Sequence, residues 1–191
     1  PKTLALLEEQ LIRLQTQITP DTIIIAAGMI KHLPRSAGDL LERYIGPVQA
    51  SLAEKKARLL FVTPTNQPQA NSPYPSEYQL EKPQLILRNH AGVFCREALD
   101  IGTRFFLPHL PADLGNAQVA DLGCGNGVLG IVCALNNPQA QLRMIDESYM
   151  AVQSAQENWQ LALAERPVTI YAGDGLGAEQ PETRDIILCN P

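Results

Sequence analysis

The stretch Asp121-Leu122-Gly123-Cys124-Gly125-Asn126-Gly127 decides the fold of this chain. A short strand pattern precedes it at Gln118–Leu122, and a helical pattern follows it at Gly127–Asn136. Glycines at such a strand-to-helix turn let the backbone turn tightly and approach a ligand without a Cβ clash. We expect the start of the helix to present free backbone N–H groups to that ligand. The stretch therefore predicts a nucleotide-binding loop in an α/β domain.

The residues after this loop alternate between strand and helix patterns. We expect strands at Gln141–Ile145, Val168–Ala172 and Asp185–Cys189, and a helix at Met150–Ala164. Strands and helices that alternate at this spacing predict parallel β-α-β units with right-handed crossovers. The predicted fold class is α/β, with a parallel sheet covered by helices on both faces.

A smaller region precedes this domain. In residues 1–63 we expect two helices and three strands: helices at 3–17 and Ser36–Tyr44, and strands at Thr22–Ala27, Val48–Leu52 and Arg58–Thr63. The first strand is fully apolar, which predicts cover on both of its faces. We interpret the region as the closing half of an α/β sheet. The many prolines that follow predict a linker at 64–84, which places the second domain at 85–191.

Composition and charge limit the class of protein. Hydrophobic residues make up 45% of the 191 residues, which argues against intrinsic disorder. The longest apolar run, Ile23–Ala27, is far short of the roughly 20 residues that span a bilayer, so we expect a cytoplasmic protein without membrane contact. The net charge of −5 divides into +2 for residues 1–63 and −7 for the rest, which weakly favours RNA binding by the first region.

Cysteine spacing and the two ends of the sequence lead to further expectations. The four cysteines form no C-x-x-C pair and have no histidine at zinc-ligand spacing, so we expect no metal. Pro1 is not an initiator methionine, so we expect a native N-terminus to precede it. The last strand pattern ends at Asn190-Pro191, where a loop and helix would follow, and we expect the stretch alone to be inactive.

Three aspartates are candidate cofactor ligands. Asp121 stands two residues before Gly123, where a carboxylate would repel a pyrophosphate but would suit the amino group of S-adenosylmethionine. Asp146 follows Gly127 by 19 residues and can bind both ribose hydroxyls, or it can cap the next helix. Asp174 lies where an adenine would be met, or it forms a turn. Gly125 to Gly130 also satisfies G-x-G-x-x-G, so a dinucleotide stays an alternative.

Asn190-Pro191 matches the start of the Asn-Pro-Pro-aromatic motif of amino-methylating enzymes. A planar amine is a weak nucleophile because its lone pair is delocalised. The Asn190 amide oxygen and the Pro191 carbonyl can accept its two N–H bonds as the nitrogen becomes tetrahedral. We therefore expect both residues to be catalytic.

Further stretches resemble one family. The segments Val93–Arg96, Leu99–Phe106, 121–127 and Asp146–Ser148 resemble class I S-adenosylmethionine-dependent methyltransferases, and among them the bacterial ribosomal RNA guanine-N2 methyltransferases, with the large-subunit (23S) type closer. This resemblance implies that Phe94, Asp100, Gly123, Gly125 and Gly127 contribute to S-adenosylmethionine binding. Cys95 is a departure, because the family usually has serine there.

The N-terminal region resembles the same family. Residues 1–10 and 55–59 are similar to its N-terminal domain, which is a degenerate methyltransferase-like domain implicated in RNA binding. The resemblance implies that residues 1–63 are the C-terminal half of that domain and that 85–191 are the N-terminal half of the catalytic domain. Lys55, Lys56 and Arg58 are its candidate RNA contacts.

The expected activity is transfer of a methyl group from S-adenosylmethionine to the exocyclic N2 of a guanine in protein-free 23S rRNA, by a monomer. The guanine must be unpaired or extruded, because a duplex hides its amine. Two alternatives keep the chemistry, with small-subunit rRNA or a protein glutamine amide as the substrate. Two others change the class, to a non-catalytic RNA-binding scaffold or a nicotinamide oxidoreductase.

Overall fold

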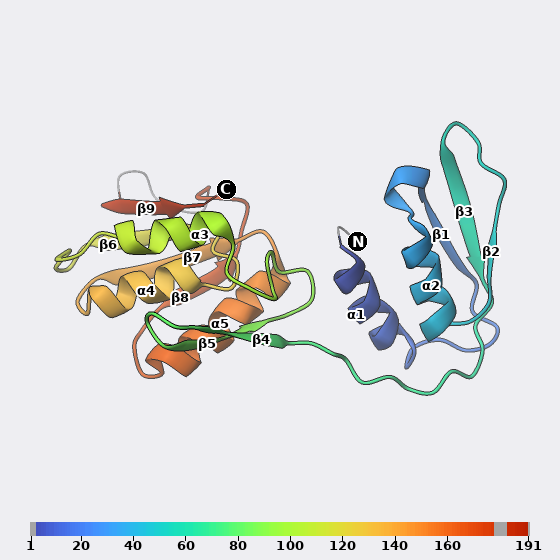
Figure 1. Cartoon of the computed structure of the whole chain (residues 1–191), viewed down its shortest axis with the longest axis horizontal. Coiled ribbons are helices and arrows are strands. Elements are labelled where there is room, and N and C mark those ends of the chain that lie inside the picture. Colours follow the sequence, from blue (N-terminus) through green and yellow to red (C-terminus); the bar gives the residue numbers. More distant parts are fainter. Residues whose placement is uncertain (1–2, 178–182, 191) are drawn as a thin grey trace. The chain divides into compact units, whose positions relative to one another are not determined.

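The computed structural model describes residues 3–177 and 183–190. The chain divides into two compact units, Pro1–Pro73 and Tyr74–Pro191 (Figure 1). In the part of the chain so described, no helix is long and apolar enough to cross a membrane.

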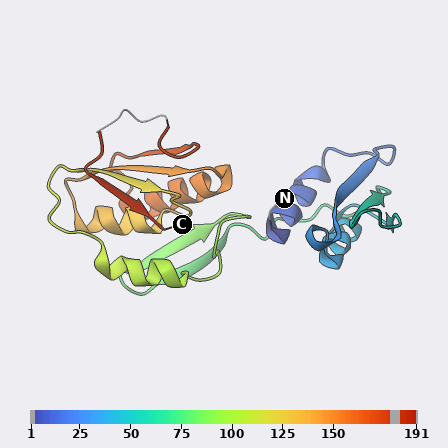
Figure 2. The ribbon, with the colours of Figure 1, turned by 90° about the horizontal axis from the view of Figure 1, so that it is seen from above.

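The second unit is built on a four-stranded parallel sheet (Figure 2). Its strands are β6 (Gln118–Leu122), β7 (Gln141–Asp146), β8 (Thr169–Ala172) and β9 (Ile186–Cys189), in the order β8-β7-β6-β9. The predicted boundaries of these four strands are confirmed to within one residue. Leu122 of β6 pairs with Ile145 of β7 and with Cys189 of β9, so the carboxyl ends of three strands lie at one level.

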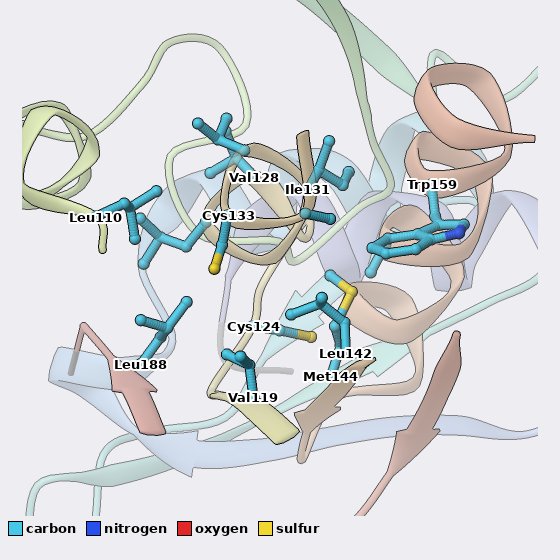
Figure 3. Close-up of a cluster of buried hydrophobic side chains, with 14 of the residues drawn as sticks. Leu110, Val119, Cys124, Val128, Ile131, Cys133, Leu142, Met144, Trp159 and Leu188 are labelled. Carbon is cyan, nitrogen blue, oxygen red and sulfur yellow. The ribbon is translucent and has the colours of Figure 1, made fainter. Parts of the chain in front are cut away.

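Helices α4 (Val128–Asn136) and α5 (Tyr149–Leu163) pack against this sheet and against each other. Figure 3 shows the buried side chains between α4 and the strands, with Trp159 of α5 beside them. Gly127 precedes α4 with a φ of +83°, and a Cβ there would lie 2.6 Å from Met144 Cε. Gly127 is therefore required both by its backbone conformation and by the close approach of α4 to β7.

A hairpin and a short helix complete this unit. The hairpin consists of β4 (Ser76–Leu80) and β5 (Leu85–Asn89), which pair antiparallel with Tyr78 opposite Leu87. Helix α3 (Ile101–Phe106) leads into the 3-10 turn η2 (Leu107–His109). Strand β4 lies inside the range expected to be a linker. Its few apolar residues and the flanking prolines concealed a half-buried strand that depends on β5 for its pairing.

Buried asparagines attach the hairpin to the rest of the unit. Asn158 of α5 is 1% exposed, and its amide binds both backbone groups of Arg88: Oδ1 accepts from N–H at 2.7 Å, and Nδ2 donates to C=O at 2.9 Å. The same Nδ2 donates to the Asn126 carbonyl at 2.9 Å. One side chain thereby connects β5, α5 and the glycine loop.

The first unit contains helices α1 (Leu4–Leu14) and α2 (Arg35–Tyr44), the 3-10 turn η1 (Ile30–His32) and strands β1 (Ile24–Met29), β2 (Val48–Ala50) and β3 (Ala57–Val62). The strands form an antiparallel sheet in the order β1-β3-β2. The expectation that the first strand is covered on both faces is wrong for these residues. Exposure alternates along β1, and Ile25 is 53% exposed opposite Phe61, which is 40% exposed.

The first part of the expected linker packs on α1. The backbone N–H of Ala70 donates to Gln15 Oε1 at 3.0 Å, and Gln15 Nε2 donates to the Pro68 carbonyl at 3.2 Å. The hydroxyl of Ser72 also donates to Glu9. Residues 68–72 are therefore bound to the first unit by polar side chains, although their composition is that of a spacer.

We predict that Asn158→Ala destabilises the second unit by about 2–4 kcal/mol, because it leaves buried backbone groups of Arg88 and Asn126 without their partners. Urea denaturation of the intact protein should show the loss, and the amide of Arg88 should exchange with deuterium faster. The matched control is Gln160→Ala, two residues further along the same helix on its exposed side. Equal unfolding midpoints for the two variants would refute this role of Asn158.

Candidate functional site

A hollow lies at the carboxyl end of β6 and β9. It is lined by the glycine loop, the start of α4 and Asn190, and by residues of the hairpin, the loop before α3 and α3 itself. Its full lining is Tyr78, Phe94, Cys95, Leu99, Asp100, Thr103, Gly123, Cys124, Gly125, Asn126, Val128, Leu129 and Asn190. The structure thus brings together residues that are 112 positions apart in the sequence.

The first two loop glycines border open space. Gly123 and Gly125 have φ values of +68° and +56°, and a Cβ built on either would meet no heavy atom within 4 Å. These glycines are needed for their left-handed backbone, and the volume above them is free for a ligand. Gly127 is also left-handed, but it differs in that a Cβ there would clash with Met144.

Most backbone N–H groups of the loop are already bound inside the protein. Gly123 and Cys124 donate to the Ile145 carbonyl at 2.8 and 3.0 Å, and Gly125 donates to Asp146 Oδ2 at 2.9 Å. Gly127 donates to the Cys124 carbonyl, and Val128 donates to Asn126 Oδ1. The expectation of free N–H groups is therefore wrong for these positions. The acceptors that hold the loop also remove most of the donors that a phosphate would need.

Asp121 lies beneath the loop. It is 1% exposed and accepts a hydrogen bond from Gly130 N at 2.9 Å, so it fixes the first turn of α4. Burial raises the pKa of its carboxyl to about 7; the Gly130 hydrogen bond opposes this shift, and the nearby charge of Asp146 adds to it. Asp121 does not belong to the lining of the hollow.

Asp146 is the last residue of β7 and Asp174 follows β8, at the same edge of the sheet and outside the lining. Asp146 is half-buried, and its two oxygens accept from Gly125 N at 2.9 Å and from Ser148 N at 2.8 Å. The alternative that Asp146 caps the next helix is wrong, because Ser148 is the N-cap of α5. Asp174 is exposed in the bend after β8.

Asn190 faces a cluster at the start of α3. Its Nδ2 donates to Thr103 Oγ1 at 2.9 Å and to Asp100 Oδ2 at 3.3 Å. Asp100 is the N-cap of α3 and accepts from Gly102 N and Thr103 N. Burial alone would raise the pKa of the Asp100 carboxyl, but hydrogen bonds from Thr103, Gly102 and Asn190 hold it below its ordinary value. Pro191 lies outside the described residues.

The predicted residue Phe94 lines the hollow, together with three polar residues to which the sequence analysis assigned no role. Phe94 is 78% exposed at the rim of the hollow. Tyr78, Thr103 and Asn126 received no role from the sequence, although all three line the hollow. Asn126 lies within the glycine loop 121–127. Thr103 follows Asp100, the N-cap of α3, by three residues. Both positions could have been predicted from these local patterns. No sequence pattern pointed to Tyr78, because it lies in the range 64–84 that was predicted to be a linker.

The basic residues of the first unit divide into two kinds. Lys55 and Lys56 are exposed at the tip between β2 and β3, with φ values of +48° and +65°. Arg58 is half-buried, and its Nη2 donates to the Leu33 carbonyl at 3.1 Å. Within residues 3–177 and 183–190, no three acidic, histidine or cysteine side chains are grouped to hold a metal ion.

Family models match both units. The methyltransferase small domain matches residues 84–191, and the RLMG N-terminal domain matches residues 1–66. The first match begins in the turn of the hairpin, so it leaves out β4.

Sequence relatives and one solved structure agree with these matches. The chain is 69% identical to "Ribosomal RNA large subunit methyltransferase G" of Stutzerimonas stutzeri (strain A1501) and 68% identical to the protein of that name from Pseudomonas putida (strain W619), over all 191 residues. It spans 51% of each, so about half the length of these curated relatives. The T. thermophilus 16S rRNA N2 G1207 methyltransferase, solved with AdoMet and guanosine, superposes with a TM-score of 0.81 at 18% identity, over 100% of this chain and 52% of that one. This likeness confirms the class I methyltransferase fold.

We predict that the titration of Asp121 weakens the fold between about pH 4 and pH 7. Its pKa is raised on folding, so the unfolded chain loses the proton first and the folded protein loses stability as the pH rises through this window. The Asp121→Asn variant keeps an acceptor for Gly130 and has no such titration. Its free energy of unfolding, relative to wild type, should therefore rise on the order of a few kcal/mol from pH 4 to pH 8.

Urea denaturation of both proteins across that range measures the difference. The matched control is Glu165→Gln, which removes an exposed carboxylate from the same unit. A difference between Asp121→Asn and wild type that stays constant with pH would contradict the buried, titrating carboxyl.

Proposed function

The chain belongs to the methyltransferase small domain family, and we propose that the protein uses S-adenosylmethionine to methylate the exocyclic N2 of a guanine in 23S rRNA. The observation that carries the proposal is the orientation of Asn190. Its NH₂ group donates to Thr103 and Asp100, so its amide oxygen is left as an acceptor on a residue that lines the hollow.

This orientation suits an amine nucleophile. The Asn190 oxygen accepts an N–H bond of the guanine amine and stabilises the positive charge that develops on nitrogen. Asp100 and Thr103 are positioning residues, because they hold the amide the right way round. Pro191, as the next residue, is proposed to accept the second N–H through its carbonyl. The cofactor supplies an electrophilic sulfonium methyl, whose transfer to N2 leaves the demethylated thioether and a released proton.

The described residues offer a fitting cradle for that cofactor. Gly123 and Gly125 leave space above the loop for the methionine part, and Phe94 borders the same hollow. Asp146 stands beside Gly125 with unused lone pairs for the ribose hydroxyls. We expect Asp174 to meet the adenine region. Asp121 acts through the loop, since its carboxylate binds Gly130 N below it.

The alternatives are less well supported. A nicotinamide dinucleotide needs free amides for its pyrophosphate, and those of Gly123 to Gly125 are bound to Ile145 and Asp146. A non-catalytic scaffold has no need of the Asn190 arrangement. Small-subunit rRNA or a protein amide would use the same chemistry, and the names of relatives at 65–69% identity favour the large subunit.

We further propose that the first unit is part of a degenerate methyltransferase-like domain that binds protein-free rRNA. The RLMG N-terminal domain model over residues 1–66 supports this proposal. Lys55 and Lys56 are its exposed candidate contacts, whereas the half-buried Arg58 donates to Leu33 within the unit. We expect the protein to act in the cytoplasm as a monomer.

Asn190→Ala should lower turnover about a hundred- to thousandfold, or about 2.7–4 kcal/mol in the barrier, because a preorganised polar group is lost in the transition state. Affinity for S-adenosylmethionine should barely change. The assay is methyl transfer by the intact protein to rRNA from a strain that lacks the enzyme, followed by nucleoside analysis for N2-methylguanine.

Gly102→Ala tests the same site without removing Asn190. A Cβ at Gly102 would lie 2.8 Å from Asn190 Oδ1, so the amide must move and turnover should also fall. Gly38→Ala in α2 is the control, since its Cβ meets only Leu60 Cδ1, at 4.0 Å. Full turnover by Asn190→Ala, or a methyl group on another atom, would refute the mechanism.

Neutralising Lys55 and Lys56 together should weaken rRNA binding and reduce the slope of log K against log salt by about 1–2, because each lost phosphate contact releases one counterion fewer. Filter binding at several salt concentrations measures the slope. Lys82→Gln, an exposed lysine of the second unit, is the control. An unchanged slope in the double variant would show that Lys55 and Lys56 face solvent and do not contact the RNA.

A further inference from the structure

The hollow contains neutral hydrogen-bonding groups and a carboxylate, but its lining includes no lysine or arginine. The amino-acid end of S-adenosylmethionine carries both an ammonium and a carboxylate. An acidic side chain suits the ammonium. Because the lining offers no cationic side chain, the cofactor carboxylate is left to a neutral donor, and the structure narrows the choice among the side-chain donors.

Three amides of the glycine loop and most side-chain donors around the hollow are already engaged. The amides of Gly123, Cys124 and Gly125 bind acceptors within the sheet. Asn190 Nδ2 donates to Asp100 and Thr103, and the Thr103 hydroxyl is itself bonded to Asp100.

The side-chain amide of Asn126 is also fully used. Its Nδ2 donates to Asn89 Oδ1 at 2.9 Å and to the Tyr78 hydroxyl oxygen at 3.0 Å, and its Oδ1 accepts from Val128 N. Since a side-chain amide has two N–H bonds, the Asn126 side chain has none left for a ligand.

Tyr78 remains. Its hydroxyl oxygen accepts from Asn126, and across the described ranges no acceptor is found for its own proton. Burial raises the pKa of Tyr78, although the Asn126 hydrogen bond opposes the shift, so the hydroxyl stays protonated at neutral pH. Strand β4 holds Tyr78 opposite Leu87 of β5, which Asn158 fixes through Arg88. The hydroxyl is thus a positioned donor at the wall of the hollow.

We propose that the Tyr78 hydroxyl donates a hydrogen bond to the carboxylate of the bound cofactor. The proposal rests on the proposed function and adds one residue to it, from a hairpin strand outside the family match at 84–191. It also gives the β4–β5 hairpin a function, because the hairpin then carries one of the ligand contacts.

Tyr78→Phe in the intact protein tests the assignment by calorimetry with two ligands. These are S-adenosylhomocysteine and its decarboxylated analogue S-adenosyl-3-thiopropylamine, which keeps the amine. The variant should lose about tenfold or more in affinity for the first, as for a hydrogen bond to a charged group, and stay within about twofold for the second. Wild type must prefer the carboxylate-bearing ligand by a similar factor, which checks the proposal without any substitution.

Each other outcome decides a different question. Equal losses for both ligands would mean that Tyr78 only supports Asn126 and the loop, and no loss for either would exclude the contact; both overturn the proposal and leave the proposed function standing. If wild type binds neither ligand, the proposed function fails as well. Tyr44→Phe is the control: it removes a buried hydroxyl from the first unit and should leave both affinities unchanged.

Discussion

The hydrogen bonds that hold the glycine loop from inside the protein are the constraint on which the rest of the site depends. Asp146 and the Ile145 carbonyl bind the amides of Gly123 to Gly125, and Asp121 binds Gly130 from below. A loop held in this way cannot also surround a phosphate with N–H groups. It offers a fixed, open surface above two left-handed glycines, which suits a ligand that is bound by side chains around it.

Those side chains come from elements far apart in the sequence. Asn190 follows β9, Asp100 and Thr103 begin α3, and Tyr78 stands on the β4–β5 hairpin. Asn126 and Asn158 connect the hairpin to the loop, so each part of the hollow is positioned by buried polar groups. Such groups are costly to bury unless every donor and acceptor is matched, and this network matches them almost completely. The site is therefore preorganised before a ligand binds.

Periodicity and glycine spacing were enough to predict the parallel sheet, because its strands alternate with helical patterns at regular spacing and β6 ends at a recognisable glycine turn. They also predicted that Asp146, Asp174 and Asn190 follow strands at one edge. Two kinds of feature could not be predicted from the sequence. Strand β4 has a weak pattern and depends on β5 for its pairing, so Tyr78 was invisible. The engagement of the loop amides depends on Ile145 and Asp146 across the sheet, and no local pattern in 121–127 encodes it.

The central claim is that the loop accepts an amino-acid-bearing nucleoside and rejects a pyrophosphate. The most direct measurement is calorimetric titration of the intact protein with S-adenosylhomocysteine and, separately, with NADH. We expect saturable binding of S-adenosylhomocysteine at one site and no heat beyond dilution with NADH. Saturable binding of NADH, together with no response to S-adenosylhomocysteine, would contradict the account.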